Sequence, residues 1–107
     1  MMAVSQDYDR YDYSSMKSDG EKLEQAAQRD YNTISKYSVS SDYQTLKTKY
    51  LSALNNAKYI GKYYKMAAEE YLKGNDDKGN EYLDKAIWDY NPKYTEDMSV
   101  VIKKMNW

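Results

Sequence analysis

The chain has no cysteine, no histidine and no phenylalanine among its 107 residues, and it has a single proline. Without cysteine it has neither a disulfide framework nor a thiolate nucleophile. Without histidine it lacks the commonest general base and the commonest metal ligand. Zinc sites of the usual kind, which combine these two residue types, are therefore excluded. We expect no metal and no cofactor.

Long apolar runs are also missing. No stretch approaches the roughly 18 consecutive apolar residues of a membrane-spanning helix. The N-terminal sequence MMAVSQDYDR lacks the basic region and the apolar region of a signal peptide. The sequence therefore predicts no membrane insertion, and it leaves the location open between the cytoplasm and a mature secreted fragment.

Charge of one sign is not in excess, because 16 cationic and 17 anionic side chains give a net charge of −1. The two signs are mixed along the chain, so no overall field attracts nucleic acid. We therefore predict no nucleic-acid partner.

What the chain does have is tyrosine. It contains 14 tyrosines, as many residues as leucine, isoleucine and valine together. A tyrosine ring in a core must bring its hydroxyl group to water or to an acceptor. We therefore expect a thin bundle with many rings at the boundary between core and water.

Helical periodicity predicts an all-α fold, because apolar residues recur at steps of three and four along most of the chain. Gly74 suits the left-handed position after a helix, and Asn91–Pro92 predicts a stop. Short connections imply antiparallel neighbours. We predict an antiparallel four-helix bundle whose second helix is long, with helices over residues 16–37, 42–73, 77–90 and 94–105.

The predicted domain organisation is a tail followed by one helical domain, residues 15–107. Residues 1–14, MMAVSQDYDRYDYS, have no helical period and alternate aspartate with tyrosine. This tail is either flexible or an acidic-aromatic arm that docks on a partner or on the chain itself. Within the long second helix, Asn55–Asn56 is the weak point, and the sequence leaves open whether the helix breaks there.

The stretch KYIGKYYKM, residues 58–66, combines lysine and tyrosine. On a helix its residues divide among three faces. These are a core face with Ile60, Gly61 and Tyr64, continued by Ala67, Ala68, Tyr71 and Leu72; a solvated lysine stripe with Lys58, Lys62 and Lys65; and a second aromatic face with Tyr59, Tyr63 and Met66.

The second aromatic face is the candidate site. A helix is apolar over a wider arc where more neighbours contact it, so the last two helices are expected to cover Tyr59, Tyr63 and Met66. The other interpretation is an exposed interaction face, since tyrosine and methionine are enriched at interfaces.

No catalytic constellation is present. The acidic stretch at 75–84 fails as a calcium loop, because with Gly79 as the loop glycine the first and fifth ligand positions fall on Gly74 and Lys78. Glu69 and Glu70 lie about 100° apart on a helix and do not converge. No glycine-rich phosphate loop and no nucleophile elbow occur. We predict that the chain is not an enzyme and has no catalytic residues.

Residues 60–92 carry one pattern of a known family. Its tryptophan, leucine and glycine positions are taken by Tyr63, Met66 and Ala67, its turn glycine by Gly74, and its later positions by Gly79, Leu83 and Ala86, with Pro92 closing the unit one residue late. Glu70 stands where an aromatic is expected. The segment resembles a single degenerate tetratricopeptide-repeat (TPR) hairpin. The resemblance implies peptide or protein binding on a helical groove.

The sequence as a whole predicts a non-enzymatic helical protein-interaction or structural module. Its partner would be another protein or a second copy of the chain. The alternative is a small-molecule-binding helical bundle with a tyrosine-lined pocket. The identity of the partner or ligand is not specified.

Overall fold

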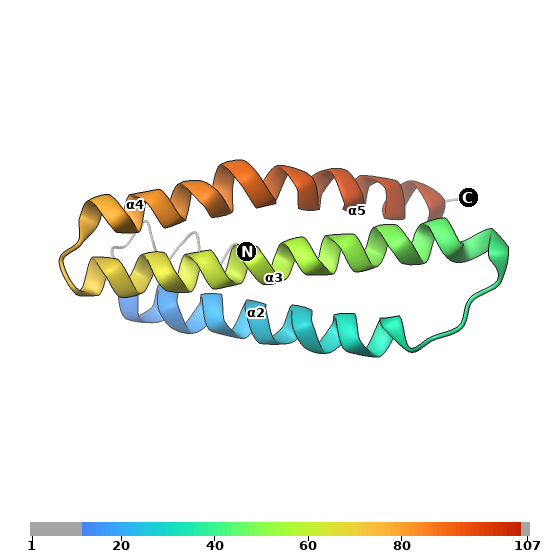
Figure 1. Cartoon of the computed structure of the whole chain (residues 1–107), viewed down its shortest axis with the longest axis horizontal. Helices are drawn as coiled ribbons and strands as arrows, with labels where there is room; N and C mark the ends of the chain where they lie inside the picture. Colours follow the sequence, from blue (N-terminus) through green and yellow to red (C-terminus); the bar gives the residue numbers. More distant parts are fainter. Residues whose placement is uncertain (1–11, 106–107) are drawn as a thin grey trace.

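The computed structural model describes residues 12–105, which form three helical rods joined by two short connections. The first rod is α2, Tyr13–Ser35, and the second is α3, Gln44–Leu72, preceded by a 3-10 turn at Ser41–Tyr43. The third joins α4, Asp76–Asp84, to α5, Asn91–Met105, through a π-helical turn at Lys85–Tyr90. Figure 1 shows the rods running antiparallel. The predicted all-α fold class is confirmed.

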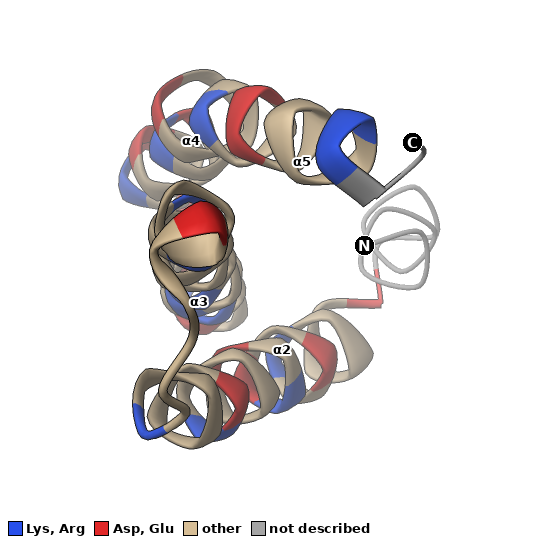
Figure 2. Ribbon diagram, turned by 90° about the vertical axis from the view of Figure 1, so that its right-hand side faces the viewer, with Lys and Arg blue, Asp and Glu red and all other residues tan. Residues whose placement is uncertain are grey.

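The long helix α3 lies between the other two rods. It packs against α2 on one side and against α4 and α5 on the other, whereas α2 makes no extensive contact with the third rod in the described part of the chain. The end-on view in Figure 2 shows this open arrangement, in which α3 occupies the corner. The molecule is elongated, 50 Å long and 22 by 19 Å across. Helix α3 therefore carries the packing surfaces of both neighbours.

The predicted stop at Asn91–Pro92 is wrong, because the helix continues through it from Asp76 to Met105. The count of four separate helices is accordingly not confirmed. In a regular α-helix the Pro92 ring would meet the carbonyl group four residues earlier, and one hydrogen bond would be lost. Here the preceding turn is π-helical, and the Asn91 N–H donates to the Ala86 carbonyl five residues back. The wider turn makes room for the proline.

The helix ends show which boundary signals operate. Helix α2 begins at Tyr13, because the Asp12 side chain accepts from the backbone N–H of Ser15 at 3.1 Å and from its hydroxyl at 2.9 Å. Tyr13 and Ser14, assigned by the sequence to the tail, are therefore helical, and residues 1–11 lie outside the described residues. Gly74 takes the left-handed conformation, with φ of +84°. Helix α3 runs unbroken through Asn55–Asn56.

The core lies along the α3 face that periodicity predicts. Its cluster of buried side chains draws on all three rods and consists of Met16, Ile60, Tyr64, Ala67, Ala68, Tyr71, Leu83 and Ala86. Leu72, also expected on that face, is instead 52% exposed at the end of α3. Because alanine and tyrosine make up much of the cluster, the core is thin.

Helices α2 and α3 touch backbone to backbone where Gly20 meets Gly61. A Cβ atom on Gly61 would lie 2.6 Å from both the Gly20 carbonyl oxygen and the Glu24 backbone nitrogen. A Cβ atom on Gly20 would lie 2.7 Å from the Gly61 carbonyl oxygen. No side chain fits at this crossing, so the two glycines set the distance between the helices.

Candidate functional site

Four tyrosine rings form a continuous row between α3 and the third rod, with two stacked contacts and one tilted contact. Tyr82 from α4 lies 6.0 Å from Tyr63 of α3, measured between ring centroids. Tyr63 stacks at 5.6 Å on Tyr90 of the π-helical turn, and Tyr90 stacks at 5.2 Å on Tyr59 of α3. We call these four residues the tyrosine ladder. Offset stacking of this kind favours association of the two rods beyond the burial of ring area.

Five lysine ammonium groups lie over the rings of the tyrosine ladder. Lys58 and Lys62 lie 5.4 and 5.8 Å from the centroid of Tyr59. The remaining three come from the third rod: Lys78 lies over Tyr82 at 5.9 Å, Lys85 over Tyr63 at 5.8 Å and Lys93 over Tyr90 at 5.4 Å. Distances below about 6 Å are those of cation–π interactions. The ladder and these lysines together are called the lysine–tyrosine strip.

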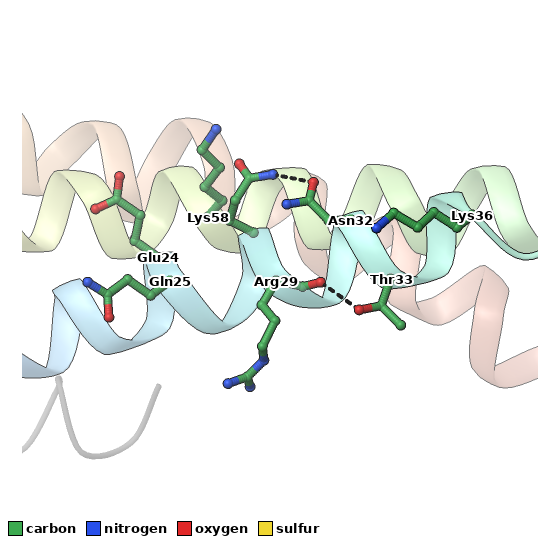
Figure 3. A pocket seen from close by; sticks show the side chains of 8 residues that line it. Glu24, Gln25, Arg29, Asn32, Thr33, Lys36 and Lys58 are labelled. Atoms are coloured by element: carbon green, nitrogen blue, oxygen red, sulfur yellow. Dashed lines mark hydrogen bonds between the residues drawn. The ribbon is translucent and has the colours of Figure 1, made fainter.

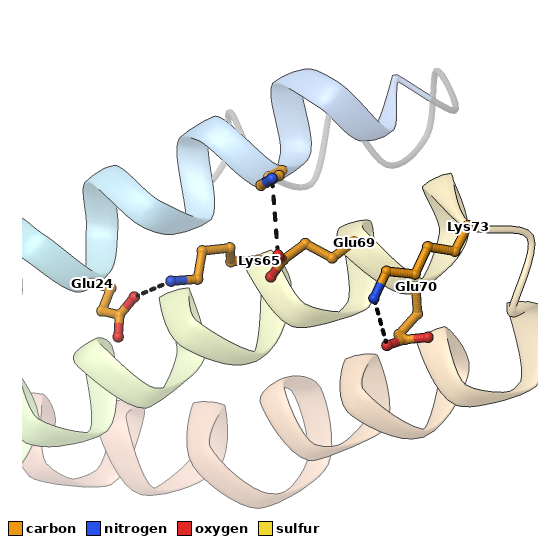
Figure 4. Close-up of polar contacts among 6 residues, drawn as sticks. Glu24, Lys65, Glu69, Glu70 and Lys73 are labelled. Atoms are coloured by element: carbon orange, nitrogen blue, oxygen red, sulfur yellow. Dashed lines mark hydrogen bonds and ion pairs between the residues drawn. The ribbon is translucent and has the colours of Figure 1, made fainter.

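The strip lysines form no ion pair with a carboxylate of residues 12–105. Other lysines of α2 and α3 do, as Figure 4 shows. Lys65 Nζ lies 3.1 Å from Glu24 Oε1, and this hydrogen bond raises the pKa of Lys65 by more than its burial lowers it. Lys17 of α2 also pairs with Glu69 of α3, at 3.9 Å. Charge is thus paired between α2 and α3 but left unpaired along the strip.

The π-helical turn brings the two halves of the strip onto one face of the third rod. Tyr82 and Tyr90 are eight residues apart, which on a regular α-helix separates them by about 80°. One extra residue in the π-helical turn removes a step of about 100°, so the offset falls to about 20°. The same holds for Lys85 and Lys93. The turn therefore aligns α4 with α5 along α3.

The packing of the ladder affects the ionisation of Tyr90. Burial raises the pKa of its hydroxyl group, and the neighbouring Tyr63, Tyr59 and Asp89 raise it further. Its ring is half-buried between the two α3 tyrosines. The hydroxyl therefore stays protonated, as a hydrogen-bond donor, to higher pH than in a free tyrosine.

The three candidate residues lie on successive turns of α3. Tyr59 and Tyr63 are half-buried and contact the third rod through Tyr90. Met66 is half-buried one turn further along α3 and takes no part in the ring stack.

The structure adds residues to this face that sequence reasoning missed. Lys58 and Lys62 were expected on a separate stripe, yet their flexible stems bring the ammonium groups over Tyr59. The contributions of the third rod, Tyr82, Tyr90 and their lysines, were also missed. The sequence pattern that could have revealed them is a lysine every seven or eight residues, at 78, 85 and 93, with a tyrosine close by.

A buried polar cluster joins α3 to α5, beyond the tyrosine ladder along the contact between α3 and the third rod. The Asp97 carboxylate, 8% exposed, accepts from the Ser52 hydroxyl at 2.5 Å and from the Asn56 amide at 3.2 Å. Lys49 Nζ approaches its other oxygen at 3.8 Å. Both carboxylate oxygens thus have partners, so this cluster links the two helices through hydrogen bonds and an ion pair.

Two hollows of the described surface were candidates for a ligand site. One of about 770 Å³ is lined mainly by polar side chains of α2, with Lys58 from α3. In Figure 3 its labelled side chains point in different directions, with Arg29 and Lys58 on opposite sides. Because no group of polar atoms converges there, this hollow offers no defined ligand site.

A second hollow, of about 230 Å³, lies where α2 connects to α3 and is almost wholly apolar. Its lining includes Tyr37 and Tyr43, which are 58% and 54% exposed. The Lys47 ammonium group fixes the connection by donating to the carbonyl oxygens of Tyr37, at 2.6 Å, and Ser35, at 3.3 Å.

Within residues 12–105 there is no group of three acidic side chains placed to hold a metal ion. No helix of the described part is long and apolar enough to cross a bilayer. No protein-family model, curated protein or solved structure matches the chain significantly.

Proposed function

We propose that the chain is a non-enzymatic protein-interaction module and that the lysine–tyrosine strip is its contact surface. Tyr59 and Tyr63 are the central side chains of this surface, and Met66 extends it along α3. The partner is another protein or a second copy of the chain. One observation carries the proposal: five lysines line a band of tyrosine rings and have no described carboxylate partner.

The reason is the contrast with the contact between α2 and α3. There lysines pair with carboxylates of the facing helix, as Lys65 does with Glu24 at 3.1 Å. The strip instead sets its cations over aromatic rings, which are enriched at protein interfaces. A partner would add the missing negative charge and would cover rings that are now half-buried.

The resemblance of residues 60–92 to a TPR hairpin supports the same proposal, since it implies binding of a peptide or protein on a helical surface. These residues form a helix–turn–helix around Gly74, and the hairpin contributes Tyr63, Tyr82 and Tyr90 to the ladder.

The geometry favours the alternative, a small-molecule-binding bundle, less. The apolar hollow with Tyr37 and Tyr43 holds about 230 Å³, below the roughly 300–1,000 Å³ of ligand pockets. A hollow of about 300 Å³ that Tyr43 also lines only reaches the lower end of that range. The ladder tyrosines stack on one another rather than around a cavity.

Photo-crosslinking tests the proposal. A photoreactive amino acid replaces Lys62 in the strip, and in a matched protein it replaces Lys22, an exposed lysine of α2. We expect a discrete protein adduct, with a partner or a second copy, from position 62 and none from position 22. Equal labelling at both positions, or none at either, contradicts the proposal. A rise in Tm with a metabolite in the absence of adducts would favour the small-molecule alternative.

A further inference from the structure

We infer that the partner presents an acidic, extended peptide segment of about seven residues, which lies along the lysine–tyrosine strip. The inference rests on the proposed function and adds the chemistry and the length of what is bound. Its basis is the sign, the spacing and the surroundings of the five lysines.

The sign of the strip is positive although the whole chain has a net charge of −1. The strip combines Lys58 and Lys62 of α3 with three lysines of the third rod, and none of these five is ion-paired within residues 12–105. On the third rod Glu81, Asp89 and Glu96 lie three or four residues from strip lysines, so five lysines against three acids leave a smaller excess of positive charge. Carboxylates supplied by a partner are therefore the complementary charge.

The spacing sets the length of the segment. Lys78 and Lys93 mark the ends of the strip on the third rod, which at about 1.5 Å per residue gives about 22 Å. An extended peptide covers about 3.3 Å per residue, so about seven residues span this distance. Lys85 lies near the middle, about 10 Å from Lys78. Carboxylates at every third peptide position would match these lysines.

The surroundings distinguish an acidic peptide from a nucleic acid, which also carries negative charge. Sequence-independent binding of single strands uses aromatic faces that are free to stack on bases. In the ladder the faces of Tyr63 and Tyr90 are directed at each other, and ammonium groups lie over the rings. Carboxylates need no free ring face, because ammonium groups and tyrosine hydroxyls bind them directly.

The test uses the full chain and a fluorescein-labelled nine-residue peptide with glutamate at every third position. Its control is the same peptide with glutamine in those places, and fluorescence anisotropy gives Kd at 50 and 300 mM salt. We expect the acidic peptide to bind at least about tenfold more tightly than the glutamine peptide. Binding should weaken at the higher salt concentration, because exposed charges are screened.

Two charge-reversal variants locate the binding. In the first, Lys62→Glu is combined with Lys85→Glu in the strip. In the second, Lys22→Glu is combined with Lys103→Glu at exposed positions elsewhere, with the same change in net charge. The strip variant should lose about tenfold in affinity for the acidic peptide, and the matched variant should stay within about twofold. Circular dichroism verifies that both fold.

Each other outcome is decisive. If both peptides bind equally, or if the two variants behave alike, the inferred acidic chemistry is wrong. If neither peptide binds while adducts at position 62 persist, the inference fails and the proposed function stands; if the adducts are missing too, both fail. Strip-dependent binding of oligo-dT or of anionic lipid vesicles, with no peptide binding, would replace the peptide by that ligand class.

Discussion

The two seams of α3 are built on opposite principles. Against α2 the backbones touch, because Gly20 and Gly61 leave no side chain between them. Against the third rod the helices are joined through large side chains, namely the tyrosine ladder and the buried Asp97 cluster. In the first contact the missing Cβ atoms bring two backbones together, whereas in the second the one close glycine, Gly79, makes room for a side chain, the ring of Tyr71.

The two contacts of α3 therefore differ in how easily they adjust to a change. A backbone contact cannot relax when an atom is added, because both sides belong to hydrogen-bonded helices. Stacked rings with half-buried edges can shift and exchange neighbours at smaller cost. The proposed contact surface lies on the second seam, where the structure can better tolerate a partner.

The largest effect is expected from Gly61→Leu on the glycine seam. Its Cβ atom alone would lie 2.6 Å from two backbone atoms of α2, so the helices must separate. Overpacking of this kind costs about 3 kcal/mol in the free energy of unfolding, the upper end of the usual range. Urea denaturation followed by circular dichroism measures it, with Thr48→Leu at an exposed position of α3 as the control. A loss below about 1 kcal/mol would show that this seam adapts as readily as the other.

A smaller effect is expected from Asp97→Ala on the opposite seam. The substitution leaves the buried amide of Asn56 without its acceptor and removes the bond from Ser52. Losing hydrogen bonds to a charged group costs about 2 kcal/mol.

The control for that experiment is Glu96→Ala, at the exposed position next to Asp97. It should change the free energy of unfolding by no more than about 0.5 kcal/mol. Equal losses for the two variants would mean that the Asp97 cluster does not stabilise the packing of α3 against α5.

Much of the fold could be predicted from the periodicity of apolar residues. The buried α3 positions Ile60, Tyr64, Ala68 and Tyr71 lie on the face that a step of three or four residues predicts. Such a pattern reports one regular helix at a time. It could not predict the continuous third rod, because the effect of Pro92 depends on a π-helical turn that has no residue signature of its own.

The candidate site was predicted in part, for a related reason. Tyr59 and Tyr63 share a helix, so their common face follows from their spacing. Their neighbour Tyr90 lies 27 residues beyond Tyr63, and its stacking depends on how two helices pair. The lysine positions could not be predicted either, since four rotatable bonds let each ammonium group reach a face that its Cα atom does not occupy.

The smallest expected effect is a change in the pH dependence of stability under alkaline conditions, and it comes from the tyrosine ladder. The pKa of Tyr90 is raised above the 10.0 of a free tyrosine, so above about pH 10 the unfolded chain releases this proton before the folded chain does. Tyr90 therefore contributes stability that is fully present below pH 10 and is lost as the pH rises through its folded-state pKa. We expect Tyr90→Phe to flatten the fall of Tm between pH 9.5 and 11.

Lys65 contributes a fall of the same sign, because its pKa is raised from 10.5 by Glu24 on the glycine seam. The control is therefore Tyr37→Phe, which leaves both seams intact and should keep the slope of the original chain. If the two phenylalanine variants show the same slope, the ladder does not perturb the ionisation of Tyr90.

The π-helical turn has a consequence for the comparison of this chain with any relative. It acts as a one-residue insertion in a repeat of seven: Lys78 and Lys85 are seven positions apart, and Lys85 and Lys93 are eight with the extra residue between them. A relative that lacks one residue between positions 85 and 90, and also lacks the proline, would present the same strip on an uninterrupted α-helix. A single-residue gap here would therefore preserve the surface, whereas the same gap in α3 would rotate one half of the ladder away from the other by about 100°.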